Sequence, residues 1–173
     1  MQKYPKHWKI ENGVALKIIP QPLSESDLRI ISKTPYLSKL YEGFLCDWLI
    51  EVIKPYLDTD QFGVKGLSIT HYLVQLLHFV QSSLDSCSPT AVIASYIDMS
   101  QAFNRVDHSL LIQDLFDMHC PSWLLRICFS FLTERVLIFQ YKGNIASPKN
   151  LPGGSPQGCL LGVIFLLLNS ILH

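Results

Sequence analysis

The stretch that decides the fold is Ala91-Val-Ile-Ala-Ser-Tyr-Ile-Asp98-Met-Ser-Gln-Ala-Phe103-Asn-Arg-Val-Asp-His108. Its first part, residues 92–97, is an apolar run rich in β-branched residues and predicts a strand that ends at Asp98. Apolar residues between positions 103 and 110 then recur at spacings of three and four, which indicates a helix. We therefore expect a central strand that carries an acid at its tip.

Asp98 has two interpretations. An acid at the mouth of a sheet commonly holds a metal ion or takes part in chemistry, because the edge of a core lowers the dielectric constant without hiding the carboxylate from a substrate. Alternatively, Asp98 only caps the helix that follows, a role that Ser100 could fill equally well. The local sequence leaves both interpretations open.

The composition indicates a folded globular protein. The chain has 173 residues and no formal net charge, with 49% hydrophobic and 16% charged residues. That balance argues against disorder and suits one domain or slightly more. A neutral chain has no bulk electrostatic attraction for nucleic acid, so a binding site would need locally concentrated positive charge.

The cysteines, the first residues and the most apolar run indicate the cellular location of the protein. Five cysteines with no close pairing and no zinc-ligand spacing indicate reduced, mostly buried thiols in an intracellular protein of the cytoplasm or nucleus. The polar start with Pro5 is unlike a signal peptide. The most apolar run, residues 159–168, is short for a membrane span and favours a core helix, although a membrane-associated protein is an alternative.

Periodicity and turn residues give the remaining elements. We expect strands at residues 14–19, 27–33, 134–141 and 145–151, and helices at residues 37–52, 69–84, 101–118 and 122–132, with a last helix after residue 158. The buried stripe of the first helix is predicted to be Leu40, Phe44, Trp48, Leu49 and Val52.

Four blocks, in order, resemble the reverse transcriptases of non-LTR retrotransposons. Tyr96-Ile-Asp-Met-Ser-Gln-Ala-Phe-Asn-Arg-Val-Asp-His108 resembles their motif A, and Leu151-Pro-Gly-Gly-Ser-Pro-Gln-Gly-Cys-Leu-Leu-Gly162 resembles motif B. Residues 29–39 and 61–70 are similar to the two finger blocks that precede motif A. The resemblance implies an α+β fold, the fingers and partial palm of a right-hand polymerase, with an incomplete antiparallel sheet packed on helices.

By the same resemblance, the chain divides into an N-terminal extension (1–26), a fingers-like segment (27–90) and a partial palm (91–173). The implied activity is RNA-directed DNA synthesis by a two-metal mechanism, with Mg²⁺ or Mn²⁺ as cofactor. The implied partners are an RNA template, a DNA primer and deoxynucleoside triphosphates, and no membrane. Asp98 and the backbone carbonyl of Met99 would bind metal, and Phe103 would pack under the sugar of the incoming nucleotide. Core packing is the alternative role for Phe103.

Motif B and the finger blocks would bind the nucleotide. The resemblance assigns Gln157 and Gly158 to the nucleotide and template, because glycine admits a close approach and glutamine offers both a donor and an acceptor. Three basic residues, Arg29, Lys33 and Lys65, would hold the triphosphate. Leu67 stands where the family often has arginine, a departure that bears on this last role.

The sequence also departs from the family by an absence. The family's second catalytic block carries two adjacent aspartates, and these 173 residues contain no such pair. One carboxylate and one carbonyl do not hold two metal ions against water, so we expect no polymerisation by this polypeptide alone. Separately, we expect part of the sheet and one face of the last helix to be exposed. A non-enzymatic RNA-binding or interaction remnant of a mobile element is the alternative function.

Overall fold

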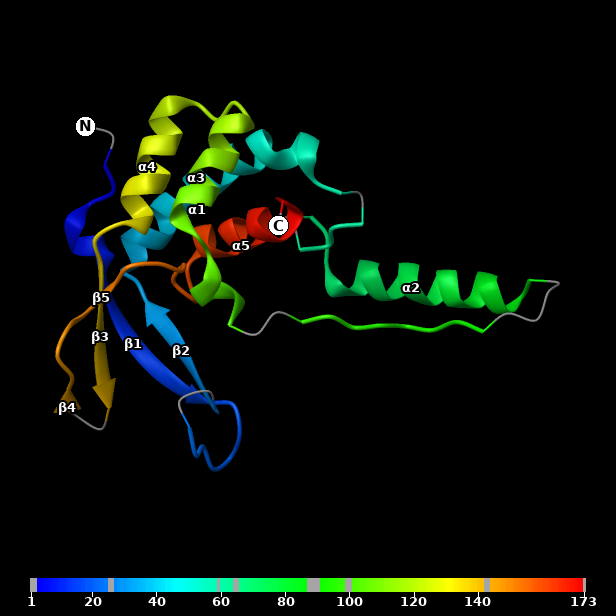
Figure 1. Cartoon of the computed structure of the whole chain (residues 1–173), viewed down its shortest axis with the longest axis horizontal. Coiled ribbons are helices and arrows are strands. Elements are labelled where there is room, and N and C mark those ends of the chain that lie inside the picture. The colour runs from blue at the N-terminus through cyan, green and yellow to red at the C-terminus, as the bar shows by residue number, and fades with distance from the viewer. Residues whose placement is uncertain are drawn as a thin grey trace. The chain divides into compact units, whose positions relative to one another are not determined.

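The structure, a computed structural model, describes residues 3–24, 27–58, 60–63, 66–86, 91–98, 101–141 and 144–172. These residues form two compact units: unit 1 takes in residues 1–55 and 101–173, and unit 2 takes in residues 56–100. Figure 1 labels the helices and strands of both units. Each unit is described here by itself.

Unit 1 contains a mixed β-sheet. Its strands are β1 (Ile10–Lys17), β2 (Leu28–Lys33), β3 (Arg135–Tyr141), β4 (Asn144–Ile145) and β5 (Lys149–Leu151). Four of them lie in the order β2-β1-β3-β4, and β5 pairs with β3. β1 is antiparallel to β2 but parallel to β3, whereas we expected an antiparallel sheet. The predicted α+β class is confirmed. The N-terminal segment supplies β1, which lies between β2 and β3.

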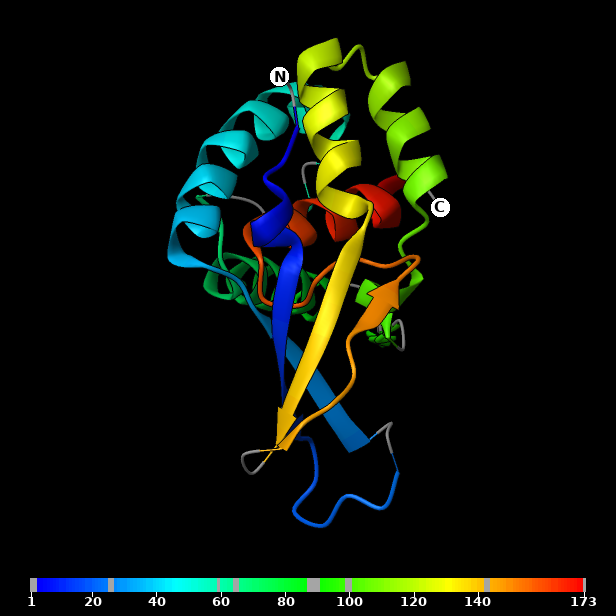
Figure 2. The ribbon, with the colours of Figure 1, turned by 90° about the vertical axis from the view of Figure 1, so that its left-hand side faces the viewer.

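The helices of unit 1 gather at one end of the sheet (Figure 2). They are α1 (Tyr36–Ile53), α3 (His108–Asp117), α4 (Ser122–Leu132) and α5 (Leu160–Leu172), with short 3₁₀ helices η1 (Lys6–Lys9), η3 (Lys54–Tyr56) and η4 (Ala102–Arg105). α5 contacts α1, α3 and η4. Its side chains Leu161, Phe165 and Leu168 are fully buried. The apolar last helix is therefore largely covered within this unit, contrary to our expectation, although Leu160 and Val163 on it are exposed.

Helix α1 has the predicted bounds to within a residue but buries only part of the predicted stripe. Leu40, Phe44 and Trp48 are about half exposed, while Leu45, Leu49 and Ile53 are fully buried. Two polar residues, Ser38 and Glu42, are also fully buried. Leu49 was therefore predicted correctly, but apolar periodicity misplaced most of the stripe because it gave no weight to polar side chains that find partners inside the protein.

A buried ion pair joins the two parallel strands. The Arg135 guanidinium on β3 donates to the Glu11 carboxylate on β1, and both side chains are buried. Arg135 also donates to the Phe131 carbonyl at 2.9 Å, and its charge lies 4.4 Å from the centre of the Phe131 ring. The pair thus ties the sheet to the end of α4.

Unit 2 contains α2 (Ile69–Leu84), which has the predicted bounds. None of the described residues of this helix is buried. Residues 91–98 form no strand, contrary to the prediction, and Ile93 and Ile97 are 88% and 95% exposed. A strand forms only with a paired neighbour, and no described strand pairs with these residues.

The helix predicted at residues 101–118 is also shorter than expected. It is divided into η4 and α3, and the carbonyl groups of Phe103 and Val106 accept bonds from the motif B loop instead of from a continuing helix. Among the described residues, no helix is long and apolar enough to cross a membrane.

Replacement of Arg135 by Met should lower the free energy of unfolding by about 3–5 kcal/mol, because it leaves the Glu11 carboxylate buried without its partner. Urea denaturation measures this. The Glu134→Gln variant is the control: Glu134 pairs with Lys9 at 3.8 Å with a 72% exposed side chain, so its loss should cost no more than about 1 kcal/mol. Equal effects of the two substitutions would contradict the role given to the buried pair.

Candidate functional site

The motif B loop, residues 152–158, is bound through its backbone to the end of motif A. The Ser155 N–H donates to the Phe103 carbonyl at 2.7 Å, and the Gly154 N–H donates to the Val106 carbonyl at 3.1 Å. The His108 ring nitrogen Nε2 lies 2.7 Å from the Gly154 carbonyl oxygen. These bonds place half-buried Phe103 beside the motif B loop within one unit.

The other side of the same loop lies against β2. The Ser32 N–H donates to the Gln157 carbonyl at 2.8 Å. A Cβ atom on Gly158, where φ is +111°, would come within 3.0 Å of the Ser32 carbonyl oxygen and 3.2 Å of an Ile31 methyl carbon. Only glycine fits this approach without strain.

The alternation of side chains along β2 places two basic residues on one face of this strand. Side chains alternate along a strand, so Arg29 and Lys33 share the face of Ile31, the side chain that Gly158 approaches. Both basic side chains are exposed. Unit 1 therefore brings together five predicted residues: Arg29, Lys33, Phe103, Gln157 and Gly158.

The other predicted residues are not assembled with them. Asp98 is exposed and belongs to unit 2, so its pairing with motif B stays a prediction. Met99 and Lys65 lie outside the described residues. Within the described part of the chain, no group of three or more His, Cys, Asp or Glu side chains could hold a metal ion.

Asp107 is a helix N-cap that was not among the residues predicted from the sequence. Its carboxylate accepts from the backbone N–H groups of Ser109 at 2.8 Å and Leu110 at 3.1 Å, and so begins α3. The cap of α3 is therefore Asp107 and not Asp98, while Ser100 lies outside the described residues. The acid one residue before a helical run was the available signal.

Cys159 caps the helix that follows motif B. The Gly162 N–H donates to the Cys159 sulfur at 3.2 Å, and the thiol donates to the Pro156 carbonyl at 3.0 Å. Burial, with a smaller contribution from the charge of Glu42, raises the pKa of this thiol to about 12. The thiol is therefore protonated at neutral pH and can make both bonds.

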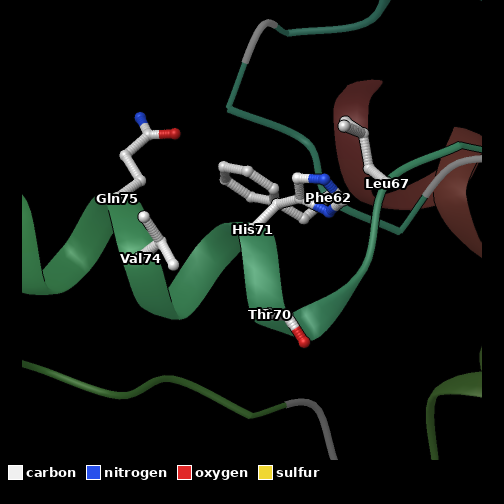
Figure 3. A pocket seen from close by; sticks show the side chains of 6 residues that line it. All are labelled: Phe62, Leu67, Thr70, His71, Val74 and Gln75. Carbon is white, nitrogen blue, oxygen red and sulfur yellow. The ribbon is translucent and has the colours of Figure 1, made fainter.

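Unit 2 has a pocket of its own, at the second finger block. It has a volume of about 400 Å³ and is lined by Phe62, Leu67, Thr70, His71, Val74 and Gln75, which Figure 3 shows. His71 Nδ1 lies 2.9 Å from Ser68 Oγ, and the Phe62 and Tyr72 rings meet edge to face at 5.6 Å. Leu67 is apolar where the family often carries arginine, so the pocket wall has no cation there.

Comparison with known proteins agrees with the motif geometry. Residues 19–171 match the family model described as reverse transcriptase (RNA-dependent DNA polymerase). The chain belongs to the reverse transcriptase family. Members of this family in general require divalent metal ions and act on RNA templates and nucleotides.

Among the similar reverse transcriptases is the probable RNA-directed DNA polymerase from transposon BS of Drosophila melanogaster, which is 31% identical over 94% of this chain. The RNA-directed DNA polymerase from mobile element jockey, from the same organism, is 28% identical over 92% of the chain. The alignment covers 18% of each relative. The predicted relation to non-LTR retrotransposon enzymes is confirmed, and the chain corresponds to a fragment of such an enzyme.

The Gly154→Ala variant should be destabilised by about 2 kcal/mol or more, because φ there is +77° and the new Cβ would lie 2.9 Å from the Phe103 carbonyl oxygen. Thermal or urea denaturation measures this. Gly153→Ala is the matched control, since its Cβ meets no atom within 4 Å. Similar losses in both variants would contradict the close junction of motifs A and B.

The Asp107 cap should make the stability of unit 1 depend on pH. Hydrogen bonds from the backbone N–H groups of Leu110 and Ser109 lower the pKa of Asp107 below its ordinary value of 3.8. A lowered folded-state pKa contributes stability that is present above pH 3.8 and is lost as the pH falls through the folded pKa.

Asp107→Asn should remove that part of the acid dependence while it keeps a capping oxygen. Denaturation between pH 2 and pH 6 compares the variant with the parent, and Asp117→Asn, an exposed acid bonded to Gln113, is the control. An unchanged acid profile in Asp107→Asn would show that the cap carries no such linkage.

Proposed function

We propose that this chain supplies the nucleotide-binding fingers and the first part of the palm of an RNA-directed DNA polymerase. The single observation that supports this best is the double attachment of the motif B loop. One side is bonded to the Phe103 and Val106 carbonyls of motif A, and the other side to Ser32 in the basic strand β2. A nucleotide next to Gln157 would thus have a half-buried aromatic side chain and two cations near it.

Each residue of this proposed site has a physical role. Arg29 and Lys33 would bind the triphosphate, since phosphate oxygens require positive charge and N–H donors. The Phe103 ring would pack under the sugar and exclude a 2′ hydroxyl. The Gln157 side chain would hydrogen-bond the nucleotide and template, and Gly158 would leave room for them. Lys65 would add a further charge.

The family's divalent metal ion would be Mg²⁺, or Mn²⁺, with Asp98 and the Met99 carbonyl as ligands. The metal ion, when bound, activates the primer hydroxyl and neutralises the leaving pyrophosphate. The proposed substrates are a DNA primer on an RNA template and deoxynucleoside triphosphates. The chain covers less than a fifth of the length of these relatives, so the activity is proposed for a whole enzyme of which this chain would form one part.

Photo-crosslinking tests the nucleotide site, because weak binding suffices for it. An azido-deoxyadenosine triphosphate with Mn²⁺ should label peptides that contain β2 and the motif B loop, and unlabelled deoxynucleoside triphosphate should compete. Lys33→Ala and Arg29→Ala should each lower the labelling about tenfold, the loss expected for one charge-assisted phosphate contact. Mass spectrometry locates the labelled peptides.

Lys39→Ala is the matched control for these substitutions. Lys39 is also an exposed cation of the first finger block, but it lies on α1 and not on β2. Its loss should leave the labelling within about twofold. Labelling that avoids both β2 and motif B, or that falls equally in all three variants, would refute the proposed site.

A further inference from the structure

A fully buried carboxylate, Glu42, lies behind the motif B loop. It is on α1, and its side chain has no solvent exposure. Its Oε2 atom accepts from the Leu160 backbone N–H at 2.9 Å, at the first residue of α5. Its Oε1 atom accepts from Ser38 Oγ at 2.9 Å and from the Tyr4 hydroxyl at 3.1 Å. The carboxylate therefore joins three segments that are far apart in the sequence.

The location of this carboxylate is costly and specific. A buried acid without partners is strongly unfavourable, and an apolar side chain at this position on the buried face of α1 would cost less free energy. The first N–H groups of a helix have no partner inside the helix and carry partial positive charge, so they attract a carboxylate. Glu42 satisfies the Leu160 N–H, while Cys159 satisfies the Gly162 N–H. The two caps bind different groups of the same turn.

The contact fixes the segment that follows the nucleotide-binding turn. Leu160 is two residues after Gly158, whose Cβ position is already closed by Ser32. The Ser32 N–H holds the Gln157 carbonyl, and the Glu42 carboxylate holds the first residue of α5. Loss of the Glu42 contact would leave the Ser32 bond as the remaining one of these two restraints on residues 157–160.

We propose that Glu42 is a positioning residue that holds the motif B turn, Gln157–Gly158, through its hydrogen bond to the start of α5. Its importance for nucleotide binding rests on the function proposed above, but the positioning itself does not. Tyr4 and Ser38 orient the carboxylate, so the beginning of the chain takes part in fixing a loop more than 150 positions later.

Amide hydrogen exchange of the peptide that spans residues 157–162 tests the positioning in the whole chain. Glu42→Asp keeps the charge but shortens the side chain by one methylene, so it should raise the exchange rate of this peptide about tenfold, as for a lost bond to a charged acceptor. Glu42→Gln keeps the reach and an acceptor oxygen, so its rate should stay within about threefold of the parent.

Which of these two variants has the higher exchange rate decides whether Glu42 positions the turn or only places a charge in the interior. If the charge alone mattered, Glu42→Gln would loosen the peptide and Glu42→Asp would not, and that order overturns the proposal. Leu115→Ala, a core truncation in α3, is the control for a general loss of stability. An equal rise in Leu115→Ala at matched stability also overturns it.

Photo-labelling of the same variants separates this inference from the proposed function. Labelling of the motif B peptide should fall in Glu42→Asp and persist in Glu42→Gln. If the parent chain is not labelled at all, the proposed nucleotide site fails, while the exchange rates still decide whether Glu42 positions the turn.

Discussion

The backbone of the motif B loop is the junction on which unit 1 depends. Its N–H groups at Gly154 and Ser155 bind the end of motif A, and its carbonyl at Gln157 binds β2. These are main-chain contacts, so they impose backbone conformations that only glycine adopts easily, at Gly154 and Gly158. A segment that reads as a simple turn in the sequence is therefore the point where strand, loop and helix are fixed relative to one another.

Buried charge surrounds this junction. Glu42 binds the start of α5, and the Arg135–Glu11 pair joins β3 to β1 and to the end of α4. Apolar side chains of similar volume would often give equal or greater stability, so such groups are weak evidence for stability itself. We expect their directional bonds instead to select one arrangement of helices over the sheet, as the proposed nucleotide site would require.

The sequence predicted the elements that depend on local signals and missed those that depend on distant partners. The bounds of α2 and α4 were correct, because Ser68 and Pro121 precede clear helical runs. The strand at residues 92–97 was wrong, because β-branched residues signal a strand but do not supply its neighbour. The buried face of α1 was predicted only in part, with Leu49 correct, because the partners of the buried Glu42 are the distant Tyr4 and Leu160. Motif spacing singled out Phe103, Gln157 and Gly158 as candidates, but the bonds from Ser155 to the Phe103 carbonyl and from Ser32 to the Gln157 carbonyl depend on the fold.

The parallel pairing of β1 with β3 has a consequence for how the chain folds during synthesis. Ile10 aligns with Val136, so β1 is synthesised more than 120 residues before the strand with which it pairs. The β1–β2 hairpin can close early, because its partners are near in sequence. Contacts of high sequence separation slow folding, since loop-closure entropy is lost before they form. Until then the inner edge of β1 is open to other chains, and a chaperone that covers it would raise the yield of folded protein.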